Sequence, residues 1–276
     1  MFRIIAKDVL SQGAGTRIIR IRVSAPAVAL KAQAGEFVLV MVTGKGERIP
    51  LTIADRDVQE GSITLVFQEA GFSTRLLGQL AEGETLYALT GPLGQATHVP
   101  ANGKIVLVGG GVGIAELYPV ARAFREKNNR VMAVLGARTK DLLVLVDDMR
   151  RVAHDFHIVT DDGSCGRQGV VTDVLREILL SDPSFPVYTV GPLPMMKAVA
   201  QVARQAGAPA VVSLNSLMVD GTGMCGGCRV TVGGQIRFVC VDGPEFDAHQ
   251  IDWEELAKRN KVYKEKEAHI CRLDSL

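Results

Sequence analysis

The sequence lacks the features of a membrane, secreted or nucleic-acid-binding protein. No stretch approaches about 18 uninterrupted apolar residues, and charges within the first eight positions leave no apolar signal core. Its 31 basic and 30 acidic residues are interspersed, so the net charge of +1 gives no electrostatic reason to expect a nucleic acid or an anionic membrane as partner. We therefore expect a cytoplasmic protein that binds small molecules and protein surfaces.

Cysteine is scarce, and its placement excludes a disulfide framework. Of the five cysteines, Cys225, Cys228 and Cys240 are clustered, whereas Cys165 and Cys271 stand apart. Asp220 precedes the cluster, giving the pattern Asp-x4-Cys-x2-Cys, with eleven residues between Cys228 and Cys240. Thiols grouped in this way indicate metal ligands in a reducing compartment.

This spacing is that of a plant-type 2Fe-2S loop, Cys-x4-Cys-x2-Cys with a distant fourth cysteine, except that aspartate replaces the first cysteine. Asp220 can supply an anionic oxygen ligand, so we expect Asp220, Cys225, Cys228 and Cys240 to hold the cluster. The glycines of the loop permit unusual dihedrals and let backbone N–H groups approach sulfur. A structural zinc site, or a glycine-rich turn that carries thiols, is the alternative.

The chain divides into three parts, which together predict a β barrel plus an α/β domain and a small appendage. In residues 1–100, short alternating runs separated by glycine-rich turns predict an antiparallel barrel. The runs are Ile18–Val23, Phe37–Val42, Ser62–Phe67 and Thr85–Leu89. In residues 101–212, strand and helix patterns alternate, which predicts an open parallel sheet. Residues 213–276 hold the cysteine loop, a hairpin that turns at Gly233-Gly234, and a charged tail predicted to be helical from Asp252.

The second part contains a glycine loop between a predicted strand and a predicted helix, where a helix N-terminus can face phosphate. The loop glycines are Gly109, Gly110, Gly111 and Gly113. They do not form a Gly-x-Gly-x-x-Gly fingerprint. The last position of this pattern is Ile114 when it is counted from Gly109, and Glu116 when it is counted from Gly111. The loop therefore predicts a nucleotide site, with a tight turn that binds nothing as the alternative.

Other residues of this part follow the later strands, where open α/β sheets bind ligands. Arg138 follows the second strand, Asp161 and Asp162 follow the third, and Gly191-Pro192 follows the fourth. The Arg138 guanidinium suits a 2′-phosphate, whereas the two carboxylates repel one and accept hydrogen bonds from ribose hydroxyls. We expect NAD(H) rather than NADP(H).

Two segments of the first part suit a flavin diphosphate. Arg48-Ile-Pro-Leu-Thr52 places a guanidinium beside a rigid turn, with Pro50, Leu51 and Thr52 along a flat ring. Gly71, with Ser73 and Thr74, begins a predicted helix that runs to Leu80, and it offers N–H groups and hydroxyls to the same diphosphate. Taken singly, a solvated surface arginine and an ordinary helix cap are the alternatives.

In this order, these motifs resemble the ferredoxin-NADP reductase superfamily over essentially the whole chain. The sequence is most similar to the electron-transfer subunit of dihydroorotate dehydrogenase B and to the small subunit of NADH-dependent ferredoxin:NADP oxidoreductase, also called sulfide dehydrogenase. The loop Asp-Gly-Thr-Gly-Met-Cys-Gly-x-Cys resembles the second, since the first carries four cysteines. One departure is Val190, which replaces the cysteine of the Cys-Gly-Pro motif found in many of these reductases.

The resemblance implies FAD at the Arg48 and Gly71 segments, NAD(H) at the glycine loop and Asp161, and electron flow in the order NAD(H), FAD, cluster and partner. FAD suits the middle place because it exchanges both electron pairs and single electrons. The implied partner, in a heterodimer, is a larger flavoprotein subunit with its own FAD and 4Fe-4S clusters. That subunit binds NADPH and splits its electron pairs, so that one electron passes to ferredoxin and the other passes through this chain to NAD+. A dihydroorotate dehydrogenase subunit and a non-catalytic zinc module are the other hypotheses.

Overall fold

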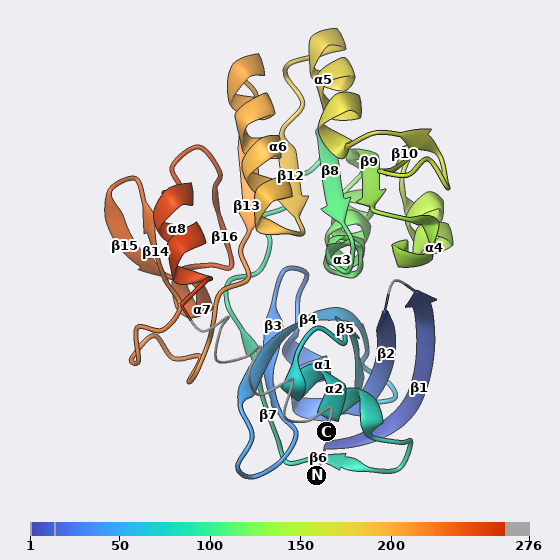
Figure 1. Ribbon diagram of the computed structural model, residues 1–276, viewed down its shortest axis with the longest axis vertical. Coiled ribbons are helices and arrows are strands. Elements are labelled where there is room, and N and C mark those ends of the chain that lie inside the picture. The colour runs from blue at the N-terminus through green and yellow to red at the C-terminus, as the bar shows by residue number, and fades with distance from the viewer. Residues whose placement is uncertain (1, 14, 263–276) are drawn as a thin grey trace.

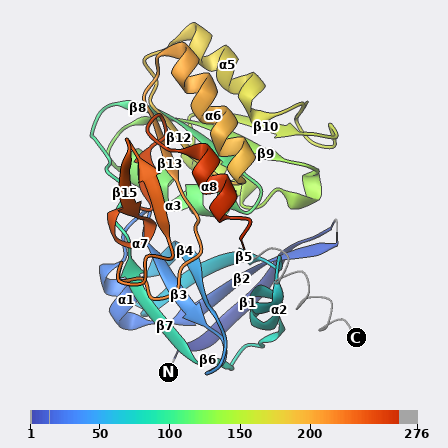
Figure 2. The same cartoon turned by 60° about the vertical axis from the view of Figure 1, so that its left-hand side comes forward.

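The computed structural model describes residues 2–13 and 15–262. An antiparallel barrel lies at one end, an α/β sheet lies at the other, and the C-terminal segment packs beside the place where they meet (Figures 1 and 2). Cys271 and the far part of the predicted tail helix lie outside the described residues.

The barrel has the strand order β6-β1-β2-β5-β4-β3-β7, with antiparallel pairing throughout. Its elements are β1 (Phe2–Gly13), β2 (Thr16–Ser24), α1 (Pro26–Lys31), β3 (Phe37–Met41), β4 (Arg48–Asp57), β5 (Ser62–Gln68), α2 (Phe72–Gln79), β6 (Thr85–Leu86) and β7 (Ala88–Leu93). Alternate residues of β2 are buried, as expected for a strand with one face on a core. The barrel predicted from the alternating runs is confirmed.

The interpretation of Arg48–Thr52 as a turn is wrong, because these residues form the first half of β4. They pair with β3 on one side only, and β4 pairs with β5 only from Ile53 onward. Proline lacks an N–H group, so a strand accepts it where one edge is free. Pro50 lies on such an edge, which explains how a turn-like sequence forms a strand here.

The α/β domain is built on the strand order β11-β10-β9-β8-β12-β13-β16. Its elements are β8 (Lys104–Gly110), α3 (Gly113–Glu126), β9 (Arg130–Ala137), the 3₁₀ helix η1 (Lys140–Leu142), α4 (Val146–Val152), β10 (Asp155–Thr160), β11 (Arg167–Gln168), α5 (Val171–Ser181), β12 (Val187–Val190), α6 (Leu193–Ala206) and β13 (Ala210–Ser213). The predicted parallel sheet is confirmed, with an antiparallel edge strand added by β16 (Glu245–Asp247). The strand order reverses between β8 and β12, which is where such sheets bind ligands.

Helices cover both faces of this sheet. α5 and α6 pack together over one face, and α3 and α4 over the other (Figure 1). α5 buries Val171, Val174, Leu175 and Ile178, the three- and four-residue spacing of an amphipathic helix. Among the described residues, no helix is long and apolar enough to cross a membrane.

The C-terminal segment contains β14 (Arg229–Val232), β15 (Gln235–Phe238), α7 (Val239–Asp242), β16 and α8 (Trp253–Arg259). The predicted hairpin is confirmed, and both glycines of its turn have positive φ. Asp252 caps α8 by accepting hydrogen bonds from two backbone N–H groups of the first turn. Buried residues of this segment join one hydrophobic core with the α/β domain and with Phe37 and Leu39 of the barrel.

Candidate functional site

Two of the predicted nucleotide-binding turns touch each other. The glycine loop connects β8 to α3, and Gly191-Pro192 connects β12 to α6. A Cβ atom on Gly113 would lie 2.9 Å from the Cα atom of Gly191, so only glycine permits this approach of the two backbones. Gly109 and Gly110 end β8 beside these turns at the carboxyl edge of the sheet.

The remaining predicted nucleotide residues lie at the same edge, after β9 and β10. The Asp161 N–H donates to the Ala137 carbonyl at 3.1 Å, and the Asp162 N–H donates to the Arg138 carbonyl at 3.3 Å. Asp162 accepts hydrogen bonds from the Ser164 side chain and backbone, which lower the pKa of its carboxyl. Arg138 and the two aspartates are therefore neighbours, and their contacts with a nucleotide stay a prediction.

A cleft of about 820 Å³ opens between the barrel, the α/β domain and the C-terminal segment. Several of the predicted flavin and nucleotide residues line it: Pro50, Leu51, Thr52, Thr74 and Pro192. The free edge of β4 faces this cleft, so its backbone groups are available to a ligand. The volume lies in the range of cofactor pockets.

Three other predicted flavin residues, Gly71, Ser73 and Arg48, do not line the cleft. The Gly71 N–H donates to the Thr74 hydroxyl oxygen at 2.9 Å, which caps α2. The Ser73 hydroxyl donates to Glu47 at 3.0 Å. The Arg48 guanidinium donates to the Val219 carbonyl at 3.2 Å, just before the cysteine loop. Their contacts with a diphosphate stay a prediction.

The cleft also contains residues that the sequence did not identify. Glu116, in the first turn of α3, lines it together with the segment Ser213–Met218, with Arg259 at the end of α8, and with Lys261 just after this helix. Burial raises the pKa of Glu116 to about 7, although a hydrogen bond with Thr52 opposes the shift. The sequence indicates Glu116 in one way only: the Gly-x-Gly-x-x-Gly pattern counted from Gly111 fails there, because an acid stands where the last glycine would be.

The four predicted cluster ligands gather in two pairs. The Cys225 N–H donates to the Asp220 carboxylate at 3.0 Å, and the Cys240 N–H donates to the Cys228 sulfur at 3.4 Å. Cys228 and Cys240 are buried, whereas Cys225 is exposed. Within the described ranges, no three His, Cys, Asp or Glu side chains converge as a single ion requires. The role of these four residues as ligands stays a prediction.

The donors around these ligands suit an iron-sulfur cluster. The Gly227 N–H donates to the Cys225 sulfur at 3.4 Å, and the Gly223 backbone hydrogen-bonds to Cys240. Burial, then the nearby Cys228 thiol, raises the pKa of Cys240 to about 12. A bound cation reverses this effect by stabilising thiolate, so the crowded thiols fit a metal cluster.

The cysteine loop is held close to the cleft. A Cβ atom on Gly221 would lie 2.8 Å from side-chain atoms of Leu39 and Leu93, so the loop lies directly on β3 and β7. The Gln95 N–H donates to the Gly243 carbonyl at 2.6 Å. Met218 lines the cleft and Asp220 begins the loop, so at most about 7 Å of chain separates them.

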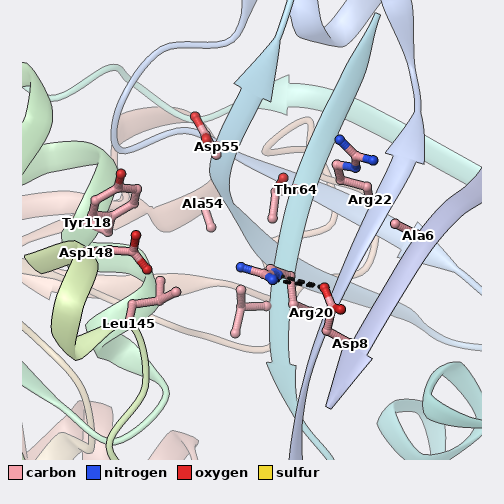
Figure 3. A pocket seen from close by; sticks show the side chains of 11 residues that line it. Ala6, Asp8, Arg20, Arg22, Ala54, Asp55, Thr64, Tyr118, Leu145 and Asp148 are labelled. Atoms are coloured by element: carbon pink, nitrogen blue, oxygen red, sulfur yellow. Dashed lines mark hydrogen bonds and ion pairs between the residues drawn. The ribbon is translucent and has the colours of Figure 1, made fainter. Parts of the chain in front are cut away.

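A second hollow, of about 460 Å³, lies between the outer wall of the barrel and α3 with α4. Figure 3 shows Arg20 reaching Asp8, and this ion pair measures 2.9 Å. Arg22 pairs with Glu60 at 3.3 Å. Because its arginines are already paired, this hollow offers less to an anionic cofactor than the cleft does.

Two protein families match parts of the chain. Residues 215–252 match the iron-sulfur cluster binding domain of dihydroorotate dehydrogenase B. Residues 107–201 match the oxidoreductase NAD-binding domain. The first range contains the whole cysteine loop and Cys240, and the second contains the glycine loop and the three strand ends that follow it.

Individual proteins are similar over most of the chain. The electron transfer subunit homolog of dihydroorotate dehydrogenase B (NAD(+)) from Thermotoga maritima is 48% identical over 245 residues, which cover 89% of this chain and 86% of that protein. The electron transfer subunit from Geobacillus kaustophilus is 35% identical over 229 residues, which cover 79% of this chain and 86% of that protein.

Solved structures extend the similarity. A chain of the NADH-dependent reduced ferredoxin-NADP oxidoreductase, studied for flavin-based electron bifurcation, is 43% identical with a TM-score of 0.92, covering 99% of this chain and 97% of that one. Ferredoxin-NADP+ reductase from Plasmodium falciparum shares the fold alone, at 12% identity and a TM-score of 0.59, over 74% of this chain and 88% of that one.

Proposed function

Because the chain belongs to the family of dihydroorotate dehydrogenase B electron-transfer subunits, within the ferredoxin-NADP reductase superfamily, we propose that it relays electrons in the order NAD(H), FAD, 2Fe-2S cluster and partner subunit. One observation carries this proposal: the segment Ser213–Met218 lines the cleft and leads directly into the cysteine loop. A flavin in the cleft lies beside a cluster in the loop. When bound, FAD exchanges electron pairs with nicotinamide and single electrons with a cluster.

The free edge of β4 binds the flavin in this proposal. Pro50, Leu51 and Thr52 lie along the ring, while the start of α2 at Gly71 faces the diphosphate. Arg48, at the end of the same edge, neutralises the diphosphate. Replacing Arg48 with Ala removes a charge-assisted contact of about 1.5–3 kcal/mol, which weakens flavin retention roughly ten-fold to a hundred-fold. Unchanged retention would overturn this placement and leave Arg48 as a tie to the Val219 carbonyl.

In this proposal Asp220, Cys225, Cys228 and Cys240 would together hold the 2Fe-2S cluster. The hydrogen bonds that bring Cys225 to Asp220 and Cys240 to Cys228 support this ligand set. An oxygen ligand at one iron, together with N–H groups aimed at sulfur, sets the potential of the cluster. Because clustered thiolates need a reducing environment, the cytoplasm is the compartment that suits this site.

NAD(H) binds along the carboxyl edge of the sheet, with its phosphates at the glycine loop and its ribose at Asp161 and Asp162. Both carboxylates disfavour a 2′-phosphate. The contact between Gly113 and Gly191 supports this placement, since it joins the phosphate turn to the edge of the cleft. Nicotinamide then reaches the flavin where α3 and α6 begin.

The partner is a larger flavoprotein subunit that carries FAD and 4Fe-4S clusters, binds NADPH and passes electrons to ferredoxin. Apolar side chains around the cysteine loop are exposed: Leu217, Val219, Ile236 and Met224, the last at 89%. Exposed apolar residues grouped at a redox centre suit a protein interface. Electrons therefore leave through this face.

A second candidate is the electron-transfer subunit of dihydroorotate dehydrogenase B itself, which the relatives at 48% and 35% identity favour. Two observations favour the first candidate, the subunit of a bifurcating reductase: Asp220, and the match to the bifurcating reductase chain over 99% of this chain. Copurification of the native complex distinguishes them. A partner reduced by NADPH supports the first candidate, and a partner that oxidises dihydroorotate supports the second.

The visible spectrum and the iron content of the purified chain test the cofactors directly. We expect flavin and iron-sulfur bands and about two irons per chain. Anaerobic NADH should bleach the flavin, and NADPH should do so with a lower kcat/KM when an artificial acceptor is present. A colourless protein that contains zinc would establish the structural-zinc hypothesis instead.

A further inference from the structure

Glu116 is an ionisable side chain in the wall of the cleft to which the electron-transfer scheme assigns no task. It lies in the first turn of α3 and lines the cleft with Thr52 of β4 and Ser213 at the end of β13. These three elements enclose the part of the cleft next to the nucleotide turns. The Glu116 side chain is half-buried and lines the cleft in which the cofactors are proposed to bind.

The polar groups behind Glu116 are acidic or neutral. Tyr188 of β12 donates to the Glu245 carboxylate of β16 at 2.9 Å, and Thr97 donates to the same oxygen at 2.5 Å. Burial raises the pKa of Tyr188, so its phenol stays protonated, and burial also raises the pKa of Glu245. Glu116 and Tyr188 are near enough that the charge of Glu116 acts on the phenol.

The charges on the other elements packed against α3 are paired elsewhere. Arg122, further along α3, pairs with Asp55 of β4 at 2.6 Å. Asp148 of α4 pairs with Arg151 of the same helix. Among the described residues, no ion pair includes Glu116. The cations that line the same cleft are Lys261 and Arg259, and the Arg259 guanidinium donates to the Gly227 carbonyl at 3.2 Å.

Charge that arrives in the cleft therefore acts on this carboxylate. Hydride transfer breaks a C–H bond of the nicotinamide ring and forms an N–H bond of the flavin ring. Two electrons move with one hydrogen nucleus, so the flavin ring gains one negative charge. A like charge nearby favours the protonated form of a carboxyl group, and protonation in turn favours the arrival of the charge.

We propose that Glu116 binds one proton from solvent each time a hydride enters the cleft and releases it when the two electrons leave for the cluster. The proton forms an O–H bond on the carboxylate, which offsets the charge gained by the flavin. This inference rests on the proposed function, since it requires flavin in the cleft. It makes Glu116 a proton-binding positioning residue, distinct from the groups that hold the cofactors.

The dependence of the flavin midpoint potential on pH tests this proposal, because its slope gives the protons bound per electron pair. In the flavin-free chain Glu116 is ionised above its pKa of about 7. The additional proton therefore appears above pH 7, and below that pH the carboxyl is protonated in both redox states. Between about pH 7.5 and 9 the full chain should bind about two protons per electron pair.

The variant Glu116→Gln should bind about one proton per electron pair in this range. Glu116→Asp, which keeps a carboxyl group, should restore the second proton. Glu126→Gln makes the same substitution at the exposed end of α3 and should behave as the parent. A redox difference infrared spectrum should contain the carboxylic acid C=O band of Glu116 in the parent and lack it in Glu116→Gln.

A parent protein that binds one proton per electron pair over this range overturns the proposal without any variant. An infrared band that persists in Glu116→Gln also overturns it. A chain that retains no flavin, or whose flavin NADH does not reduce, contradicts the proposed function instead. The two failures are therefore distinguishable in one preparation.

Discussion

Replacing Glu116 with Gln should stabilise the protein at high pH and leave its stability unchanged at low pH. Folding raises the pKa of this carboxyl from 4.5 to about 7. The folded chain therefore binds the proton more tightly than the unfolded chain does. Stability from this source is complete below pH 4.5 and is lost as the pH rises through 7.

The magnitude follows from the shift. Each pKa unit is worth about 1.4 kcal/mol, so an ionised Glu116 costs roughly 3 kcal/mol, and screening by solvent in the cleft reduces this to roughly 2–3 kcal/mol. For a chain of this size, each kcal/mol moves Tm by roughly 2 °C. Glu116→Gln should therefore raise Tm by about 4–6 °C at pH 8.5 and by only about 1 °C at pH 5.

Differential scanning calorimetry measures this effect. The protein should be free of flavin, because bound flavin changes the surroundings of Glu116, and it should retain its cluster. Glu126→Gln is the matched control, and its Tm should differ from the parent by the same small amount at both pH values. A Tm difference for Glu116→Gln that is equal at pH 5 and pH 8.5 would refute the reasoning.

Three further predictions concern the cofactors. Cys240→Ala should lose the cluster, whereas Cys165→Ala, in the loop after β10, should keep it; iron content after purification checks both, and the reverse result would show that the ligand set is wrong. Asp220→Cys restores a full set of thiolates and should keep a 2Fe-2S cluster with an altered potential, measured by redox titration; loss of all iron would exclude Asp220 as a ligand. Replacing Asp161 and Asp162 with Asn should narrow the preference for NADH over NADPH in kcat/KM, because two charges that repel a 2′-phosphate are removed; an unchanged ratio would place the ribose elsewhere.

The sequence predicts the parts of this fold that depend on local periodicity. The runs at Ile18–Val23 and Ser62–Phe67 became β2 and β5 because alternating apolar residues suit a strand that packs on a core, although β5 also buries residues of its other face. The failure at Arg48–Thr52 has a tertiary cause. Whether Pro50 lies in a turn or on a free strand edge depends on where β4 changes partner, and residues distant in the sequence determine that.

The parts of the candidate site that a single loop carries could be proposed from the sequence. The ligand spacing from Asp220 to Cys228 and the glycine loop are of this kind. The cleft is different, because its wall is assembled from β4, α3 and the segment Ser213–Met218, which meet only in the folded chain. Glu116 shows the same limit. The failed Gly-x-Gly-x-x-Gly pattern marks its position, but only the folded chain reveals the cleft in which burial raises its pKa.

The order in which NADH reduces the two cofactors tests the central claim most directly. In an anaerobic stopped-flow experiment with the purified chain, the flavin absorbance should fall first and the cluster bands should follow. In Cys240→Ala, NADH should still bleach the flavin, with no second phase. Cluster reduction that precedes flavin reduction, or that proceeds in a flavin-free chain, would contradict the proposed path from NAD(H) through FAD to the cluster.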